Sequence, residues 1–520
     1  MKKGRLNPSG EPLTVDAPMS NSLLPYDQLC LRAREVRLIR DIGSTLGWDQ
    51  ETYLPPSGVA WRADQMSWLG AEAHRRFTAP EVGDWIAAAE ADPARAAENE
   101  AEAELHQANL REWRHDYDLA TRLPVALVEE AAQAQAHAKE AWVAARQTSD
   151  FALFAPHLGK LIDISRRKAD FWGYETCAYD ALLDTYERGT RSDNLEILFN
   201  DLRKDLVPLV AEATSHPRSP EDLLAGHYAV EKQQAFNREV AEAVGFNFQA
   251  GRIDTTVHPF CTDLGPSDVR LTTRYDESDF RSSLFGVLHE AGHGLYEQGL
   301  PAGLRGQPAG DSVSLGVHES QSRLWENHVG RSLAFWEIWL PRAAAHFPHL
   351  SRLTPQAMYL AVNHAKRSLI RVEADEVTYD LHIMLRFEIE RGIFSGDLAV
   401  QDIPGEWNVR FHQLMGLAVP TDSQGCLQDI HWSLGGFGYF PTYSLGNLNA
   451  AHLFAAAQRK DPAISRGLAK GDYAPLLGWL RTQIHQQGRR HLPGDLITRA
   501  AGAPVSSEAM LTHLRTRYLS

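Results

Sequence analysis

The sequence predicts an all-α fold that contains one small β element. Apolar residues recur at helical spacing through most of the 520 residues, which is typical of packed amphipathic helices. Strands and helices do not alternate regularly, and no unit of about 20 to 50 residues is repeated. Only the stretch 251–274 is rich in β-forming residues, so we expect one short hairpin among helices.

The helical segments follow one another along the chain, and most end near glycine or proline. The predicted ranges are 26–46, 60–76, 82–146 with breaks near Pro93 and Pro124, 151–171, 195–216, 229–244, 285–296, 317–327, 353–392 and 447–518. Residues 1–22 are polar and interrupted by Pro8, Pro12 and Pro18. We therefore predict a disordered tail at 1–22, followed by a single domain at 23–520.

Composition and charge exclude several classes of protein. A net charge of −15 disfavours nucleic acid or an anionic membrane as a partner. The sequence has no run of about 18 apolar residues that would span a bilayer. The first residues are basic but lead into polar and proline residues instead of an apolar stretch, so we expect a cytoplasmic protein.

The four cysteines are scattered and form no CxxC pair, as expected for reduced thiols that pack as small hydrophobic groups. They are Cys30, Cys177, Cys261 and Cys426. Any metal site in this chain is therefore expected to use histidine and carboxylate ligands.

The strongest motif is His289-Glu290-Ala291-Gly292-His293, which lies in the apolar run 285–296. Histidines four residues apart project from the same face of a helix, so both imidazoles can bind one zinc ion. Glu290 lies about 100° round the helix, beside the metal, where it can take a proton from a water molecule. The alternative is an ordinary helix with two surface histidines, but an apolar stripe at helical spacing argues against it: Leu284, Leu288, Ala291 and Leu295.

A zinc hydrolase needs a third protein ligand and an open fourth position. The extended HExxHxxGxxH pattern would require glycine at 296 and histidine at 299, whereas the chain has Tyr296 and Gly299. The third ligand must then come from the next predicted helix, 317–327, beyond a glycine-rich loop. We predict Glu319 as this ligand, with Glu326 as the weaker alternative.

Two β-rich runs, 255–262 and 269–274, precede the motif and flank Gly265-Pro266. They predict a hairpin beside the metal helix, which could hold an extended peptide by main-chain hydrogen bonds. A plain connecting hairpin is the alternative. His258 lies in the first run and is a candidate hydrogen-bond donor to an oxyanion.

In the predicted helix 353–392, Arg367, Arg371 and Asp375 are spaced by four residues and would share one face. On the surface this would be a row of salt bridges. If the face is buried toward the metal, an arginine becomes a receptor for a substrate carboxylate.

The segment 425–443 combines histidine, tyrosines and several glycines in a predicted loop between helices. Loops of this composition often line functional sites. His431, Tyr439 and Tyr443 are candidate donors to an oxyanion. In the following region, His485 is predicted to be a packed core histidine.

The chain resembles the thermostable carboxypeptidase Taq family of metallocarboxypeptidases from about Tyr26 onward. The resemblance is carried by motifs in a fixed order: His258-Pro259-Phe260, Asp268-Val269-Arg270-Leu271-Thr272, His289-Glu290-Ala291-Gly292-His293, His318-Glu319-Ser320-Gln321, Ile370-Arg371 with Ala374-Asp375, and the segment from Gly425 to Trp432. It implies a large, almost wholly helical zincin-type fold, with two lobes around a deep central cleft.

The resemblance also implies a homodimeric enzyme that releases single amino acids from peptides with a free C-terminus, with broad specificity. His289, His293 and Glu319 resemble the family's ligands for zinc, or in some members cobalt, and Glu290 resembles the residue that acts on water. We expect substrate binding by other residues of the motifs: Arg270, Arg371, Asp268, Gln321 and Asp429. Two alternatives are an endopeptidase or oligopeptidase with the same metal centre, and a non-catalytic helical binding protein.

Overall fold

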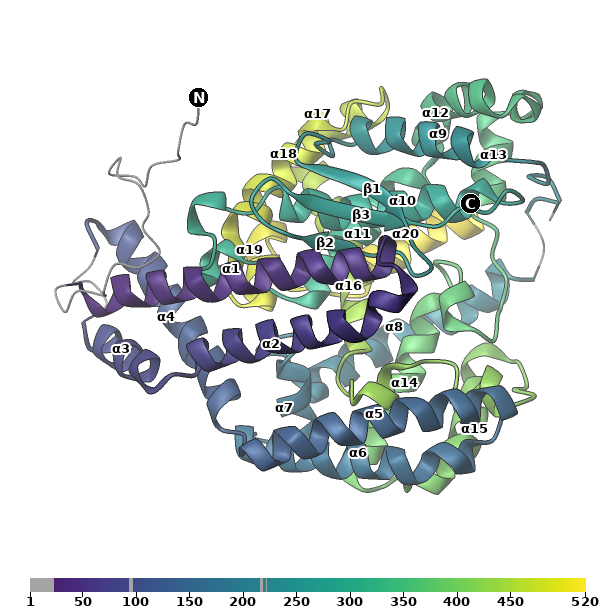
Figure 1. The fold of residues 1–520 in the computed structure, drawn as a ribbon. Coiled ribbons are helices and arrows are strands. Elements are labelled where there is room, and N and C mark those ends of the chain that lie inside the picture. Colours follow the sequence, from purple (N-terminus) through teal and green to yellow (C-terminus); the bar gives the residue numbers. More distant parts are fainter. Residues whose placement is uncertain (1–22, 93–96, 216–217, 221) are drawn as a thin grey trace.

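A computed structural model of the chain describes residues 23–92, 97–215, 218–220 and 222–520. The tail predicted at 1–22 lies outside the described residues. Within the described part every helix is too short or too polar to cross a lipid bilayer. The predicted all-α class is confirmed, because helices of different lengths account for most of the fold (Figure 1).

The first ten helices lie before or at the metal motif. They are α1 (Pro25–Thr52), α2 (Val59–Phe77), α3 (Pro80–Ala91), α4 (Glu100–Thr121), α5 (Val125–Thr148), α6 (Phe151–Trp172), α7 (Ala178–Asp184), α8 (Ser192–Ala213), α9 (Val230–Ala243) and α10 (Phe280–Glu297). The other ten are α11 (Leu315–Arg323), α12 (Leu333–His346), α13 (Pro355–Val362), α14 (Tyr379–Ser395), α15 (Ile403–Met415), α16 (Pro441–Lys460), α17 (Pro462–Leu468), α18 (Ala474–Gln483), α19 (Pro493–Ala501) and α20 (Glu508–Leu519).

Two large hydrophobic cores organise these helices. One gathers side chains from α5 to α8, α14, α15 and the segment 426–440. The other gathers side chains from α9, α10, α12, α18 and the strands. Helix α16 contributes to both, with Leu448 in the first core and Leu453 in the second. The elements that carry the metal motif and those that carry the predicted 425–443 loop thus belong to different cores joined by α16.

The β element is a three-stranded sheet in the order β1-β3-β2. Strands β2 (Cys261–Asp263) and β3 (Val269–Thr273) are antiparallel, which confirms the predicted hairpin in a shorter form. The run 255–262 is not one strand, because the chain leaves β1 (Gly251–Thr255) and passes through His258-Pro259 before β2 begins. Strand β1 pairs in parallel with β3, a pairing that the sequence did not indicate.

The prediction of one continuous helix at 353–392 is wrong for the middle of this range. Helix α13 ends at Val362 and α14 begins at Tyr379, with an irregular segment between them. Asp375 holds this segment by accepting hydrogen bonds from the backbone N–H groups of Lys366, Val377 and Thr378. Arg367, Arg371 and Asp375 therefore do not share a helix face, since the local carboxylate stabilises a turn in place of the helix.

Helices α10 and α11 pack closely enough to share one site. A Cβ added at Gly292 would lie 2.5 Å from the carbonyl oxygen of Gln321 and 2.6 Å from Cα of Ser322. Only glycine permits this approach. Directly after α11 the chain forms a π-helix, Leu324–Gly330, a form that is rare and frequent at functional sites.

Candidate metal centre

Helix α10 presents His289 and His293 from one face, as predicted, with their ring centroids 4.9 Å apart. The helix begins at a side-chain cap, where Asp279 accepts a hydrogen bond from the N–H of Arg281. Its opposite face is anchored in the core by fully buried residues such as Leu284, Leu288 and Leu295. The two imidazoles are therefore held by a rigid, packed element.

Glu319 on α11 completes a cluster of three ligand atoms that lie within 4.8 Å of one another. Its Oε2 atom is 3.6 Å from Nε2 of His289 and 3.5 Å from Nε2 of His293. Ligands about 2.1 Å from a tetrahedral zinc ion are separated by about 3.4 Å, so these distances match two edges of its coordination polyhedron. The residues present fit a divalent metal.

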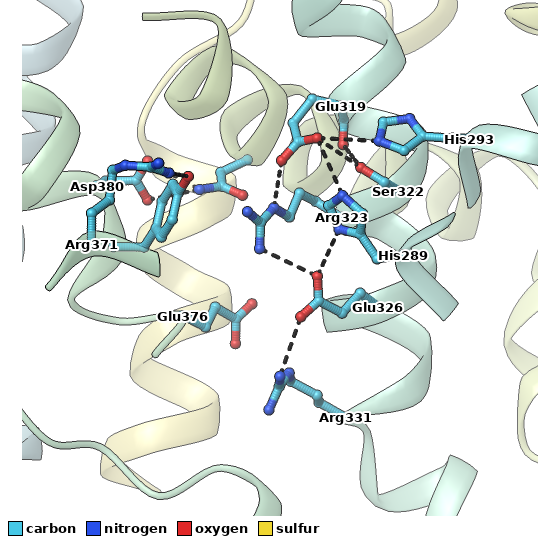
Figure 2. A network of polar contacts seen from close by, with 12 residues as sticks. His289, His293, Glu319, Ser322, Arg323, Glu326, Arg331, Arg371, Glu376 and Asp380 are labelled. Atoms are coloured by element: carbon cyan, nitrogen blue, oxygen red, sulfur yellow. Dashed lines mark hydrogen bonds and ion pairs between the residues drawn. The ribbon is translucent and has the colours of Figure 1, made fainter. Parts of the chain in front are cut away.

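An outer carboxylate orients the imidazole of His289 (Figure 2). Nδ1 of His289 is 3.0 Å from Oε2 of Glu326, and this carboxylate also accepts a hydrogen bond from Arg331. A carboxylate only accepts, so His289 carries its proton on Nδ1 and keeps the lone pair of Nε2 for a metal. Glu326, the weaker candidate for the third ligand, thus lies behind the ring of His289.

His293 is oriented by a longer chain of contacts. Its Nδ1 atom lies 2.5 Å from Nδ1 of His318, whose Nε2 is 2.8 Å from Oε1 of Glu297. His318 therefore donates to Glu297 and accepts from His293, which again leaves Nε2 of His293 free to bind a metal. Burial lowers the pKa of His293 to about 4, so the ring is neutral near pH 7, as a ligand must be.

Glu319 is fixed on both oxygens. Oε1 accepts a hydrogen bond of 2.7 Å from Nε of Arg323, and Oε2 accepts one of 3.0 Å from the Ser322 hydroxyl (Figure 2). Burial opposes ionisation, but Arg323 and the imidazoles hold the pKa of Glu319 well below its usual range. Gly446 of α16 packs directly on its side chain, where a Cβ would lie 2.4 Å from Cγ of Glu319.

Glu290 differs from its neighbours because it makes no hydrogen bond or ion pair to any described residue. Its side chain is nevertheless buried, with 6% of the residue exposed. Burial raises the pKa of Glu290 to about 7, and the carboxylates of Glu319 and Glu326 contribute to the rise. The arrangement leaves this carboxylate available for a water molecule beside the three ligand atoms.

The family model described as carboxypeptidase Taq (M32) metallopeptidase matches residues 28–518. The chain belongs to this family. It is therefore a metallocarboxypeptidase, an enzyme that hydrolyses peptide bonds with the help of a metal cofactor. Membership favours this activity over the endopeptidase and the binding-protein alternatives.

Individual relatives agree with the family assignment. The chain is 41% identical over 505 residues to thermostable carboxypeptidase 1 of Thermus thermophilus, covering 95% of this chain and 98% of the relative. It is 36% identical over 473 residues to carboxypeptidase 1 of Bacillus subtilis, covering 91% and 93%. The crystal structure of an M32 carboxypeptidase from Deinococcus radiodurans superimposes with a TM-score of 0.90 at 40% identity, covering 95% and 98% of the two chains.

Among the predicted substrate residues of this carboxypeptidase, Arg371 and Asp429 are in direct contact. Nε and Nη2 of Arg371 lie 3.0 and 2.8 Å from Oδ1 of Asp429, and Nη1 donates to the Tyr379 hydroxyl at 2.8 Å. Arg386 binds the other oxygen of Asp429. The guanidinium of Arg323 lies over the Tyr379 ring, with its Cζ 4.8 Å from the ring centroid. Tyr379 therefore connects Arg371 to Arg323, which binds Glu319.

The three predicted donors of the 425–443 segment lie together. Nε2 of His431 is 3.2 Å from the Tyr443 hydroxyl, and the Tyr439 and Tyr443 rings are 5.4 Å apart. Burial lowers the pKa of His431 to about 4, so its ring is neutral near pH 7. Burial is the largest cause that raises the pKa values of both tyrosines, and Glu319 contributes to each, which places them in the electrostatic field of the metal cluster.

The other predicted residues lie elsewhere. His258 is exposed in the connection between β1 and β2. Arg270 of β3 pairs with Asp268 at 2.8 Å, and its guanidinium stacks over Trp48 at 4.1 Å. Gln321 is fully buried and binds Nε2 of His485 through Oε1 at 3.0 Å, which also confirms His485 as a core histidine.

Sequence reasoning missed most of the outer partners of this metal centre. His318 was part of a motif but had no predicted role, and no role was predicted for Glu297 or Arg323. Glu297 falls eight residues after His289 on α10, and Arg323 four after Glu319 on α11, so helical periodicity places each near the same face as a ligand. That spacing was the available signal.

Proposed function

We propose that the resident metal is zinc, held by His289, His293 and Glu319, and that Glu290 is the general base and acid of peptide hydrolysis. The observation that carries this proposal is the single carboxylate oxygen of Glu319, which lies 3.5 and 3.6 Å from the two imidazole Nε2 atoms. Two imidazoles and one carboxylate are a ligand set of catalytic zinc sites, which keep a fourth position open.

When bound, the cation supplies Lewis acidity, which polarises the scissile carbonyl and makes water a better acid. Glu290 accepts the proton of the attacking water through its unengaged carboxylate and then passes it to the leaving amine. Burial raises the pKa of Glu290, which makes its carboxylate a stronger base toward the attacking water.

The oxyanion that forms at the carbonyl needs hydrogen-bond donors besides the metal. Tyr439 and Tyr443 are the leading groups, since both lie in the field of Glu319 and carry hydroxyls that stay protonated at neutral pH. His431 holds the Tyr443 hydroxyl from behind. Removing one such donor typically costs about 2.7 to 4 kcal/mol in the barrier. His258 is the remaining candidate donor, and it would have to reach the oxyanion from an exposed loop.

A carboxypeptidase must also bind a free carboxylate, and a guanidinium is the fitting receptor. Arg371 donates a hydrogen bond to Tyr379, whose ring contacts Arg323 beside Glu319, but it already binds Asp429. Arg270 engages Asp268 through Nε and Nη2, while its Nη1 makes no hydrogen bond to a described residue. We propose that one of the two binds the substrate. Substitution of the receptor by alanine should raise KM for free-acid peptides far more than for C-terminal amides.

The decisive experiment is the variant Glu290→Gln, which keeps the shape of the side chain and removes the base. We expect it to bind metal with wild-type stoichiometry while kcat falls by about 10² to 10⁴-fold, the usual contribution of general acid–base catalysis. Metal content is measured by mass spectrometry and activity by the time course of C-terminal shortening of a peptide. Full activity in Glu290→Gln would refute the role of Glu290.

We also propose a homodimer, as the resemblance implies. Helix α2 exposes Trp61 and Trp68, two turns apart on one face, with 70% and 66% of each residue accessible. The neighbouring α1 exposes Leu38 and Ile42. Large exposed apolar side chains on two neighbouring helices are typical of interaction surfaces. Sedimentation of Trp61→Ser/Trp68→Ser should show a monomer where the wild-type protein is a dimer.

A further inference from the structure

A second cluster of metal-ligating side chains lies outside the catalytic centre. It brings together His328 of the π-helix, Glu376 of the irregular segment before α14, and His513 of α20. One ligand atom from each residue lies within 4.8 Å of the other two. The three residues are far apart in the sequence, so the fold alone creates this cluster.

The contacts of the cluster leave one group unsatisfied. Nε2 of His513 is 2.8 Å from Oε1 of Glu376, while Oε2 of Glu376 accepts hydrogen bonds from Arg517 at 2.8 Å and Tyr518 at 3.3 Å. The rings of His328 and His513 have centroids 4.1 Å apart. His328 is only 6% exposed, and its Nδ1 atom is buried without a hydrogen-bond partner. A buried polar atom of this kind is rare and calls for a partner that protein atoms do not supply.

We infer that His328, Glu376 and His513 form a second metal site, which binds a divalent transition metal of the zinc, cobalt or nickel class. Two imidazole nitrogens and one carboxylate oxygen suit these borderline cations, whereas magnesium and calcium prefer all-oxygen sites. The inference is independent of the proposed catalytic roles, since none of the three residues is a ligand or base of the first centre.

The protonation states favour a metal. Burial lowers the pKa of His328 well below its usual range and also lowers that of His513, so both rings are neutral at pH 7. Burial opposes the charge on Glu376, but Arg517 and His513 hold its pKa well below the usual range, so it is anionic. Arg517 also places a positive charge near the cation. We therefore expect weaker binding here than at the catalytic centre.

The geometry needs a small adjustment. The three ligand atoms lie within 4.8 Å of one another, and two ligands that are each about 2.1 Å from one metal are at most about 4.2 Å apart, so metal binding closes any separation that exceeds this value. The metal would replace the hydrogen bond between His513 and Oε1 of Glu376, while Oε2 keeps Arg517 and Tyr518. Such a site would tie the C-terminal helix α20 to the π-helix, which also carries Glu326 against His289.

The test uses the full-length protein, stripped of metal and titrated with Co²⁺, whose visible absorption and bound stoichiometry are both measured. We expect two equivalents in the wild-type protein. His328→Leu removes the unsatisfied nitrogen and should bind one equivalent, as should His513→Asn. His293→Asn should lose the other equivalent. His452→Asn is the matched control, because His452 is a buried histidine that binds the Ala503 carbonyl outside both clusters, and it should retain two.

In this experiment the second metal site can be rejected without rejecting the catalytic centre. One equivalent in the wild-type protein, lost in His293→Asn and unaffected in His328→Leu, would overturn the second site and leave the catalytic centre intact. Two equivalents that persist in both His328→Leu and His513→Asn would also overturn it. The catalytic equivalent reports the folding of His328→Leu and His513→Asn, and His328→Leu tests the second site even if His513→Asn fails to fold.

Discussion

The two histidine–carboxylate clusters use the same ligand types, but their surroundings differ. In the catalytic cluster, His289 and His293 each have a partner behind the ring, and Glu319 is held on both oxygens. In the second cluster His328 has an unsatisfied nitrogen, and Glu376 gives one oxygen to Arg517. The catalytic cluster is already arranged for a metal, whereas the second must rearrange to receive one.

The difference indicates that outer partners, more than ligand types, decide which cluster catalyses. Partners that fix tautomer and ring orientation raise both affinity and geometric precision. Among the described residues, the second cluster also lacks a counterpart of Glu290, a buried carboxylate that makes no hydrogen bond or ion pair. We expect it to bind metal without hydrolysing peptides.

The largest expected effect comes from removing one histidine of each cluster. His293→Asn should lower kcat by at least about 10³-fold, since the metal's stabilisation of the transition state is worth several kcal/mol. His513→Asn should keep kcat close to the wild-type value at saturating zinc. Steady-state hydrolysis of a free-acid peptide measures both. Equal losses in the two variants would contradict the division between a catalytic and a non-catalytic cluster.

A second prediction tests what a buried carboxylate contributes when its ion-pair partners are guanidiniums. Asp429 binds the two buried guanidiniums of Arg371 and Arg386, and Asp429→Asn would leave them without a counter-charge. Removing one partner of a buried ion pair usually costs about 3 to 5 kcal/mol of unfolding free energy. The midpoint of urea unfolding should fall accordingly, and Asp422→Asn in the same segment should change it less.

The loss of stability in Asp429→Asn should depend on pH in a defined way. Burial favours neutral Asp429, but Arg386 and Arg371 hold its pKa well below the usual range. A carboxyl whose pKa is depressed in the folded state stabilises the protein above the pKa of the unfolded state, and this contribution is lost as the pH falls toward the folded value. The stability gap between wild-type and Asp429→Asn should therefore narrow below about pH 5. A constant gap down to pH 3 would contradict the assignment.

The contrast between the clusters also explains how far sequence reasoning reached. His289 and His293 are four residues apart on one helix, so local periodicity was enough to pair them, and Glu319 followed from the next helical run. The second cluster joins residues 328, 376 and 513, which no local pattern relates. The same limit applies to the parallel pairing of β1 with β3, which depends on tertiary structure.

The error at 353–392 has a local cause. Apolar periodicity favoured a continuous helix, but Asp375 competes for backbone N–H groups and holds a turn. That turn carries Arg371 to Asp429 and Glu376 to Arg517. Arg371 and Glu376 thus serve two different polar clusters, which the helical pattern alone did not reveal.

A third prediction would make the catalytic cluster resemble the second one. Glu326→Gln keeps an acceptor for Nδ1 of His289 but removes the charge that it shares with Arg323 and Arg331. Loss of an outer partner typically costs about 10 to 100-fold in metal affinity or activity. Competition with a chelator measures the affinity, and His346→Gln, a ring that binds Glu239 far from both clusters, is the control. Unchanged affinity would show that the ligands alone suffice.

The smallest expected effect concerns the helix that supports Glu319 from behind. At Gly446 of α16 a Cβ would lie 2.4 Å from Cγ and 2.6 Å from Cβ of Glu319, so Gly446→Ala must push the ligand aside. Overpacking of this kind costs about 1 to 3 kcal/mol. Gly478 of α18 is the matched control, because a Cβ there meets nothing within 4 Å and alanine is the better helix former.

The two glycine variants should therefore change the unfolding midpoint in opposite directions. Gly446→Ala should lower both the unfolding midpoint and zinc affinity, while Gly478→Ala should leave affinity unchanged and raise the midpoint slightly. Because the second cluster has no contact with Gly446, its Co²⁺ equivalent should persist in both variants. Weaker metal binding at both clusters in Gly446→Ala would mean that the variant loosens the whole fold, and the specific support of Glu319 by α16 would then be wrong.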